Sequence, residues 1–119
     1  MGAWNDGKYS HIIGYGIGQY YENTKAELSK YLKLDYLFDR KWEESDKKEY
    51  DGIALVRRSD LIKFQNALVI VFTGNTWIYH SIQSDLNDLK GIDHIHVDEI
   101  IGRNICLTGK MLREEFTDG

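Results

Sequence analysis

Apolar positions along this chain fall either in short continuous runs or in stripes at helical spacing. The clearest run is ALVIVFTG, residues 67–74, in which apolar side chains are almost uninterrupted. A strand that alternates apolar and polar residues buries one face, so an unbroken run predicts a strand buried on both faces, as in a parallel sheet. Shorter apolar runs predict four further strands at residues 11–13, 34–39, 53–56 and 94–97.

Helical stripes lie between several of these runs. Residues 18–32 carry apolar side chains every three or four positions, which predicts an amphipathic helix. Ser59 is a suitable cap for a short helix that runs to Phe64. The charged segment 40–52 predicts a surface loop.

A third helix is expected directly after the best strand. Asn75 or Thr76 can cap it, and Gly91 is expected to end it. Its apolar stripe consists of Ile78, Ile82, Leu86 and Leu89.

The resulting alternation of strands and helices predicts an α/β protein. We expect a Rossmann-like three-layer fold with a parallel sheet of about five strands. Right-handed crossovers favour the strand order 3-2-1-4-5, with the strands numbered along the chain. Residues 1–101 are expected to form this domain, and residues 102–119 a tail or linker towards a further domain.

Composition narrows the class of protein. The chain has 119 residues, 42% of them hydrophobic and 29% charged, which is ordinary for one soluble globular domain. The net charge of −4 argues against nucleic acid as a partner, because a phosphate backbone requires a basic face. No apolar run approaches 18 residues, so we expect no membrane insertion. The single cysteine, Cys106, fits a reducing environment, and we expect a cytoplasmic protein.

Three glycines lie between the first predicted strand and the first predicted helix. Gly14 permits a tight turn, Gly16 permits close approach of a phosphate, and Gly18 begins a helix whose N-terminal amides can bind an anion. The third glycine of the dinucleotide-binding pattern GxGxxG is replaced by Gln19. The motif is therefore incomplete, and the glycines could form only a strand–helix turn.

A second part of the predicted site comes from the ends of two other strands. Asp39 ends the second predicted strand 23 residues after Gly16 (39 − 16), where an acidic residue accepts hydrogen bonds from ribose hydroxyls. Alternatively, Asp39 only caps the charged loop. Thr73, Gly74 and Asn75 follow the best strand at the edge of the sheet where ligands of open α/β proteins bind.

A family resemblance rests on the stretches HIIGYGIGQYYENTKAEL, LDYLFDRKW, YDGIALVRRSDL, ALVIVFTG and IHVDEI. Together they resemble the Rossmann-like N-terminal domains of bacterial surface-polysaccharide enzymes, which include the nucleotide-sugar-binding domains of nucleotide-sugar acetyltransferases and related CoA-binding-like modules. The resemblance covers residues 11 to about 101. It implies that Gly14, Gly16 and Asp39 line a site for a small-molecule nucleotide ligand, with a nucleotide sugar, NAD or CoA as the candidates. It also implies that catalysis lies in a following domain, through which homo-oligomers could form.

Other functions remain open at this point. The chain could be an interaction or scaffold domain that keeps only the fold. A remoter alternative is a metal-dependent hydrolase, because strand alternation would place His94, His96 and Asp98 on one face. The favoured interpretation of these residues is an edge strand with a polar outer face and no metal. Trp77 and Tyr79 are candidates for stacking on a ligand beside the glycines.

Overall fold

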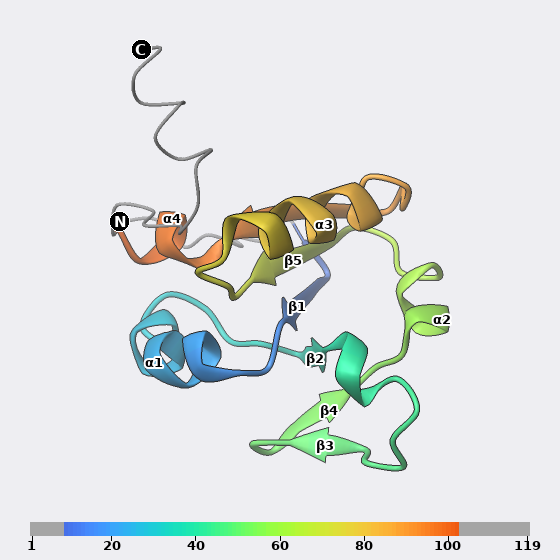
Figure 1. The fold of residues 1–119 in the computed structure, drawn as a ribbon, viewed down its shortest axis with the longest axis horizontal. Helices are drawn as coiled ribbons and strands as arrows, with labels where there is room; N and C mark the ends of the chain where they lie inside the picture. The colour runs from blue at the N-terminus through green and yellow to red at the C-terminus, as the bar shows by residue number, and fades with distance from the viewer. Residues whose placement is uncertain (1–8, 103–119) are drawn as a thin grey trace.

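The structure is a computed structural model, and it describes residues 9–102. Its centre is a six-stranded sheet in the order β3-β4-β2-β1-β5-β6, in which every pairing is parallel except that of β3 with β4 (Figure 1). The strands are β1 (His11–Tyr15), β2 (Tyr36–Phe38), β3 (Glu49–Tyr50), β4 (Ile53–Leu55), β5 (Ala67–Val71) and β6 (Ile92–His96). The chain is therefore a mixed α/β protein, as the sequence predicts.

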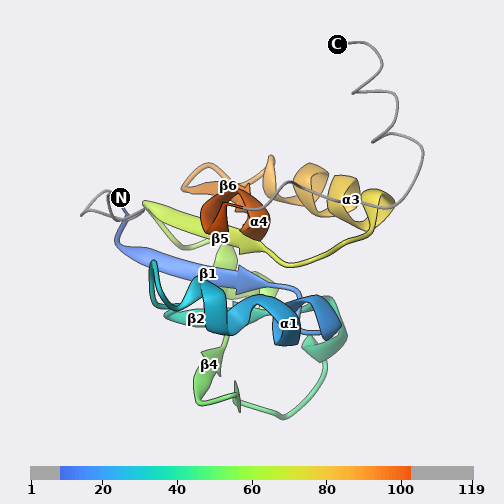
Figure 2. The same ribbon diagram turned by 90° about the vertical axis from the view of Figure 1, so that its left-hand side faces the viewer.

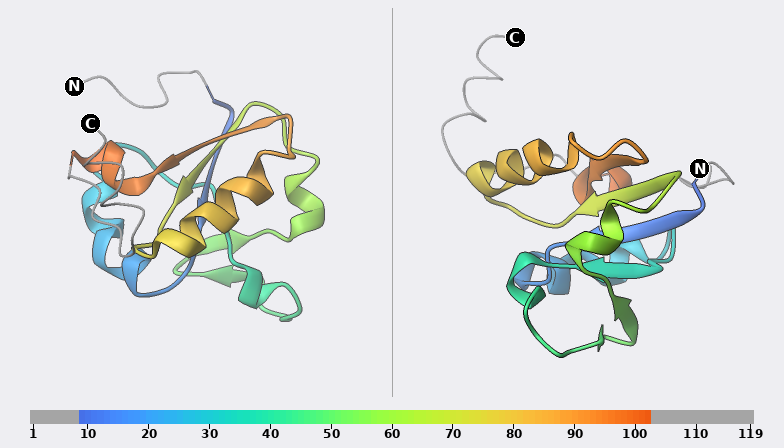
Figure 3. Two further views of the ribbon diagram at one scale, coloured as in Figure 1. Left: turned by 45° about the horizontal axis from the view of Figure 1, so that its top comes forward. Right: turned by 90° about the vertical axis from the view of Figure 1, so that its right-hand side faces the viewer.

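Helices cover both faces of the sheet. They are α1 (Gln19–Leu28), the 3-10 helix η1 (Arg40–Trp42), α2 (Arg58–Leu61), α3 (Thr76–Leu86) and α4 (Val97–Ile101). Helices α1 and α4 contact each other and lie in front of the strands in Figure 2. Helix α3 crosses the strands on the opposite face (Figure 3). No helix in residues 9–102 is long and apolar enough to cross a membrane.

Strand β5 lies in the middle of the core. All five of its residues are buried, and it pairs in parallel with β1 on one side and β6 on the other. Leu68 and Ile70 belong to the apolar cluster under α1 and α4, whereas Val69 and Val71 belong to the cluster under α2 and α3. The prediction of a doubly buried parallel strand beside the first strand is confirmed.

The predicted sheet of five strands in the order 3-2-1-4-5 needs correction. The sheet has a sixth strand, β3, which forms the edge and runs antiparallel to β4 within a segment that we predicted as a loop. Asp51 and Gly52 join these two strands, and both have positive φ angles of 57° and 77°. Two central residues with positive φ form the tight turn that matches the twist of a hairpin, and Asp-Gly is a strong sequence signal for it.

The helix boundaries also differ from the predictions. Helix α1 ends at Leu28, not at residue 32, and α3 ends at Leu86, five positions before Gly91 (91 − 86). Gly91 serves packing instead, because a Cβ atom there would lie 2.2 Å from the carbonyl oxygen of Phe64. Helix α3 is capped by Asn75, one of the two predicted caps, through a bond from the Ile78 amide.

Two shorter elements are shifted as well. Helix α2 begins one residue before the predicted cap Ser59, and its first turn is closed by the Asp60 carboxylate, which accepts a 2.9 Å bond from the Arg57 amide. The last predicted strand ends at His96, and Val97 begins a helix. The predicted tail, residues 102–119, lies outside the described residues apart from Gly102.

Candidate functional site

A cleft of about 440 Å³ opens at the carboxyl ends of β1 and β5. One wall is the loop that connects β1 to α1, and the other is the loop that connects β5 to α3. Strand β1 is the point where the strand order reverses, because β2 pairs with one of its edges and β5 with the other. Open parallel sheets bind ligands at such a point, because the loops after the two strands diverge to opposite faces.

The cleft contains six of the seven residues predicted for the site. These are Gly16, Gly18, Asp39, Thr73, Gly74 and Asn75. Gly14 is buried within β1 and is not part of the lining. A Cβ atom at Gly14 would lie 2.8 Å from Cδ2 of Leu37, so this glycine is explained by packing between β1 and β2.

The two lining glycines of the first wall have different roles. Gly16 has a φ angle of +109°, and a Cβ atom there would lie 2.7 Å from the carbonyl oxygen of Phe72. A glycine is therefore required at position 16 by the backbone itself. Gly18 is the N-cap of α1, has an extended backbone and forms no side-chain cap, and a Cβ atom there would meet nothing within 4 Å. Gly18 thus leaves the start of α1 open towards the cleft.

Asp39 connects the glycine loop to the segment after β2. Its Oδ2 accepts a 2.6 Å hydrogen bond from the Ile17 amide, and its Oδ1 accepts a 3.0 Å bond from the Lys41 amide. The structure thus contains the capping role that the sequence left as the alternative. A carboxylate has about four lone-pair sites, so these two bonds leave acceptor capacity for a ligand hydroxyl.

Two cations in the lining were missed by the sequence reasoning. Lys41 donates a 2.5 Å bond from Nζ to the carbonyl oxygen of Ile17, and Arg40 donates from Nε to the hydroxyl of Tyr15 at 3.0 Å. Burial raises the pKa of Tyr15, and Arg40 partly opposes this. The signal was the pair Arg40-Lys41 directly after the second strand, which we assigned to a surface loop.

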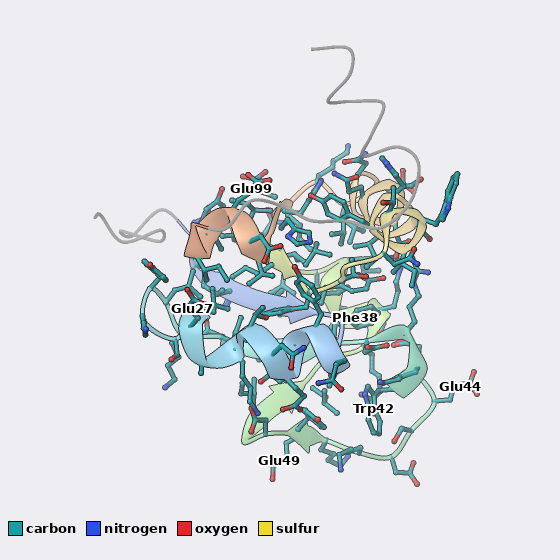
Figure 4. All side chains as sticks on the ribbon, turned by 60° about the vertical axis from the view of Figure 1, so that its left-hand side comes forward. Glu27, Phe38, Trp42, Glu44, Glu49 and Glu99 are labelled. Atoms are coloured by element: carbon teal, nitrogen blue, oxygen red, sulfur yellow. The ribbon has the colours of Figure 1, made fainter. Side chains whose placement is uncertain are left out.

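The side chains that line the cleft carry more positive than negative charge. Asp39 is its single carboxylate, against the two cations Arg40 and Lys41. Other acidic side chains, such as those of Glu44, Glu49 and Glu99, are exposed on the surface and are not part of the lining (Figure 4).

The second wall is held by side chains within its own loop and behind it. The backbone amide of Asn75 donates to the Thr73 hydroxyl at 3.2 Å, and the side chain of Asn75 caps α3. Behind the loop, Nε2 of His96 lies 2.7 Å from the carbonyl oxygen of Thr73.

The structure corrects the arrangement expected around the two histidines. His96 is fully buried, not on a polar outer face, and Asp98 lies on α4 and not on the strand. Both ring nitrogens of His96 have hydrogen-bonding partners, and His94 lies beside Gln83. Within residues 9–102 no three His, Cys, Asp or Glu side chains are grouped as metal ligands. Cys106 lies outside these residues.

The two aromatic candidates for ligand stacking lie outside the lining of the cleft. Trp77 is 71% exposed on the first turn of α3. Tyr79 packs edge-on against His96, with ring centroids 5.0 Å apart, and burial raises its pKa. The apolar contribution of α3 to the cleft comes from Ile78 and Ile82 instead.

Fold and site together define a mostly parallel α/β domain with a cleft at the reversal point of its sheet. Comparisons of the chain with protein-family models, with curated proteins and with solved structures give no match.

Proposed function

We propose that the cleft binds a nucleotide, with a nucleotide sugar as the favoured class. The observation that carries this proposal is the uncapped start of α1 at Gly18, which opens into a cleft lined by two cations. The amides and dipole at a helix N-terminus favour a phosphate, and Arg40 and Lys41 add positive charge beside it. Asp39 offers acceptor sites for ribose hydroxyls next to the same loop.

The proposed biological role follows from the sequence resemblance. The chain is the ligand-binding domain of a cytoplasmic bacterial polysaccharide-biosynthesis protein, an acetyltransferase or another transferase, and catalysis belongs to a further domain. NAD and CoA are alternative ligands for the same cleft, since both carry a pyrophosphate. The rival function is a scaffold domain in which the glycines form only a turn.

Calorimetric titration with UDP, UDP-N-acetylglucosamine, NAD and CoA tests this proposal. Gly18→Asp is the informative variant, because a carboxylate at position 18 would accept the first amides of α1 and repel a phosphate. We expect it to weaken binding about tenfold or more, which corresponds to about 1.4 kcal/mol. The fold should remain at least as stable, since Asp is a favoured N-cap and the added side chain meets no neighbour.

Asn23→Asp is the matched control. It adds the same charge to the same helix, at an exposed position outside the cleft lining. We expect this variant to bind like the wild type. No heat with any of the four ligands would favour the scaffold function, and equal losses in both variants would place the ligand elsewhere.

A further inference from the structure

A buried polar cluster lies directly behind the cleft and joins its two walls. Its members are Tyr20 in the first turn of α1, His96 at the end of β6 and Asp98 in α4. The histidine and the aspartate are only 0% and 1% exposed. Tyr20 itself lines the cleft and donates its hydroxyl to Oδ2 of Asp98.

The hydrogen bonds define the tautomer of His96. The Asp98 amide donates to Nδ1 at 3.1 Å, so Nδ1 carries no proton. Nε2 therefore carries the proton and donates it to the carbonyl oxygen of Thr73 at 2.7 Å. The imidazole uses both nitrogens, one to cap α4 and the other to hold the loop after β5.

Aromatic packing fixes the orientation of the same ring. Tyr20 and Tyr79 both pack edge-on against it, with centroid distances of 5.8 and 5.0 Å. The ladder between β5 and β6 ends at the pair of Val71 and His96, so Thr73 lies beyond it. The hydrogen bond from His96 to Thr73 thus holds the backbone of the loop beyond the end of the strand pairing.

We infer that His96 is a positioning residue for the cleft. Its Nε2–H bond to Thr73 holds residues 73–75 as one wall, and the Tyr20–Asp98 bond ties the start of α1, the other wall, to the same cluster. Preorganised loops bind more tightly because less ordering remains to occur on binding. The conclusion that this wall serves a nucleotide rests on the proposed function. The conclusion that His96 positions the wall does not rest on it.

Two substitutions separate the two bonds of His96. In His96→Asn, the shorter side chain keeps an oxygen near the place of Nδ1 and still caps α4, but it does not reach Thr73. In His96→Gln, the longer side chain carries an amide donor to the place of Nε2, while the cap of α4 is lost. A purely space-filling role for His96 would make the two variants alike.

Amide hydrogen exchange measures how often the loop of residues 73–75 opens in the free protein, so the experiment needs no ligand. The Asn75 amide bonds to the Thr73 hydroxyl, and the Ile78 amide bonds to the Asn75 side chain, so both report opening of the wall. We expect His96→Asn to speed their exchange about tenfold, the effect of one net hydrogen bond at the upper end of its range, and His96→Gln to restore wild-type protection. Unchanged exchange in His96→Asn, or equal acceleration in both variants, would overturn the inference.

Titration with UDP separates this inference from the proposed function. Weaker UDP binding in His96→Asn, with rescue in His96→Gln, supports both. Absence of UDP binding by the wild type counts against the proposed function, while the exchange rates still decide the role of His96. Should neither variant fold, the imidazole ¹⁵N shifts of the wild type decide: the Nε2–H tautomer is expected, and the Nδ1–H tautomer would overturn the inference, because it cannot donate to Thr73.

Discussion

The carboxylate of Asp39 accepts a 2.6 Å hydrogen bond from the backbone amide of Ile17. The residue predicted to accept ribose hydroxyls therefore also holds the glycine loop against the end of β2. A change at Asp39 would affect the shape of the cleft as well as its chemistry, so loss of ligand binding by an Asp39 variant is not by itself proof of direct contact.

We predict that Asp39→Ala lowers the free energy of unfolding by roughly 1.5–3 kcal/mol, the net contribution of a hydrogen bond to a charged group. Asp39→Asn should lose less, because its one amide oxygen still accepts one of the two amides. Urea unfolding measures both values, with Asp46→Ala, at an exposed loop position, as the control. If Asp39→Ala were as stable as the control, the hydrogen bond from the Ile17 amide would contribute nothing to the stability of the fold.

The two lining glycines should differ in how much the same small change destabilises the fold. We predict that Gly16→Ala costs roughly 1–3 kcal/mol, because alanine is strained at a φ angle of +109° and its Cβ would meet the Phe72 carbonyl. Gly18→Ala should cost less than about 1 kcal/mol, since its Cβ enters open space and only N-cap preference changes. Thermal unfolding of the two variants decides; equal destabilisation would contradict the separation of roles.

Two apolar residues of α3 should differ in how much they stabilise the fold. Ile82 is 3% exposed in the core under α3, whereas Trp77 is 71% exposed. We predict that Ile82→Ala lowers the free energy of unfolding by roughly 2–5 kcal/mol, through lost burial and the cavity left behind. Trp77→Ala should stay within about 0.5 kcal/mol of the wild type in the same urea titration. A large loss at Trp77 would show that this side chain is covered in solution.

The central part of the fold could be predicted because one physical signal dominates it. The unbroken apolar run of β5 has no polar face to expose, so burial between two helical layers is the arrangement that satisfies it. The pairing of β5 with β1 followed from that burial and from right-handed crossovers. Strand β3 was missed because its residues, Glu49 and Tyr50, lie in a charged segment, although Asp51-Gly52 marks a hairpin.

The polar groups behind the cleft could not be predicted from periodicity. His94, His96 and Asp98 share a face only if the strand continues, but the chain changes from strand to helix after His96. This change turns the Asp98 amide towards the His96 ring and places both side chains in the core. Burial of such groups is tolerated where hydrogen bonds replace water, and those partners come from Thr73 and Tyr20, which are distant in sequence.

The turn between β3 and β4 provides a prediction for acid stability. The Asp51 carboxylate accepts a 2.8 Å bond from the Tyr21 hydroxyl and a 3.0 Å bond from Nζ of Lys25. These two bonds, that of Tyr21 foremost, lower the pKa of Asp51 below its usual value. A lowered pKa in the folded state stabilises the fold above the unfolded-state pKa, about 4, and this stabilisation is lost as the pH falls through the folded-state value.

We therefore predict that Asp51→Asn is less stable than the wild type at neutral pH and that this difference shrinks below about pH 4. Asparagine tolerates the positive φ angle of 57° at position 51, so the turn itself should survive. The effect should be small, because the pair with Lys25 is partly exposed. Urea midpoints measured from pH 7 to pH 2.5 test it, with Asp46→Asn as the control. Wild-type and Asp51→Asn midpoints that fall in parallel over this range would show that Asp51 contributes nothing to acid sensitivity. Some acid sensitivity should remain in the variant because of Glu22. Its pKa is lowered mainly by the hydrogen bond from the Tyr50 hydroxyl and to a smaller extent by Lys25.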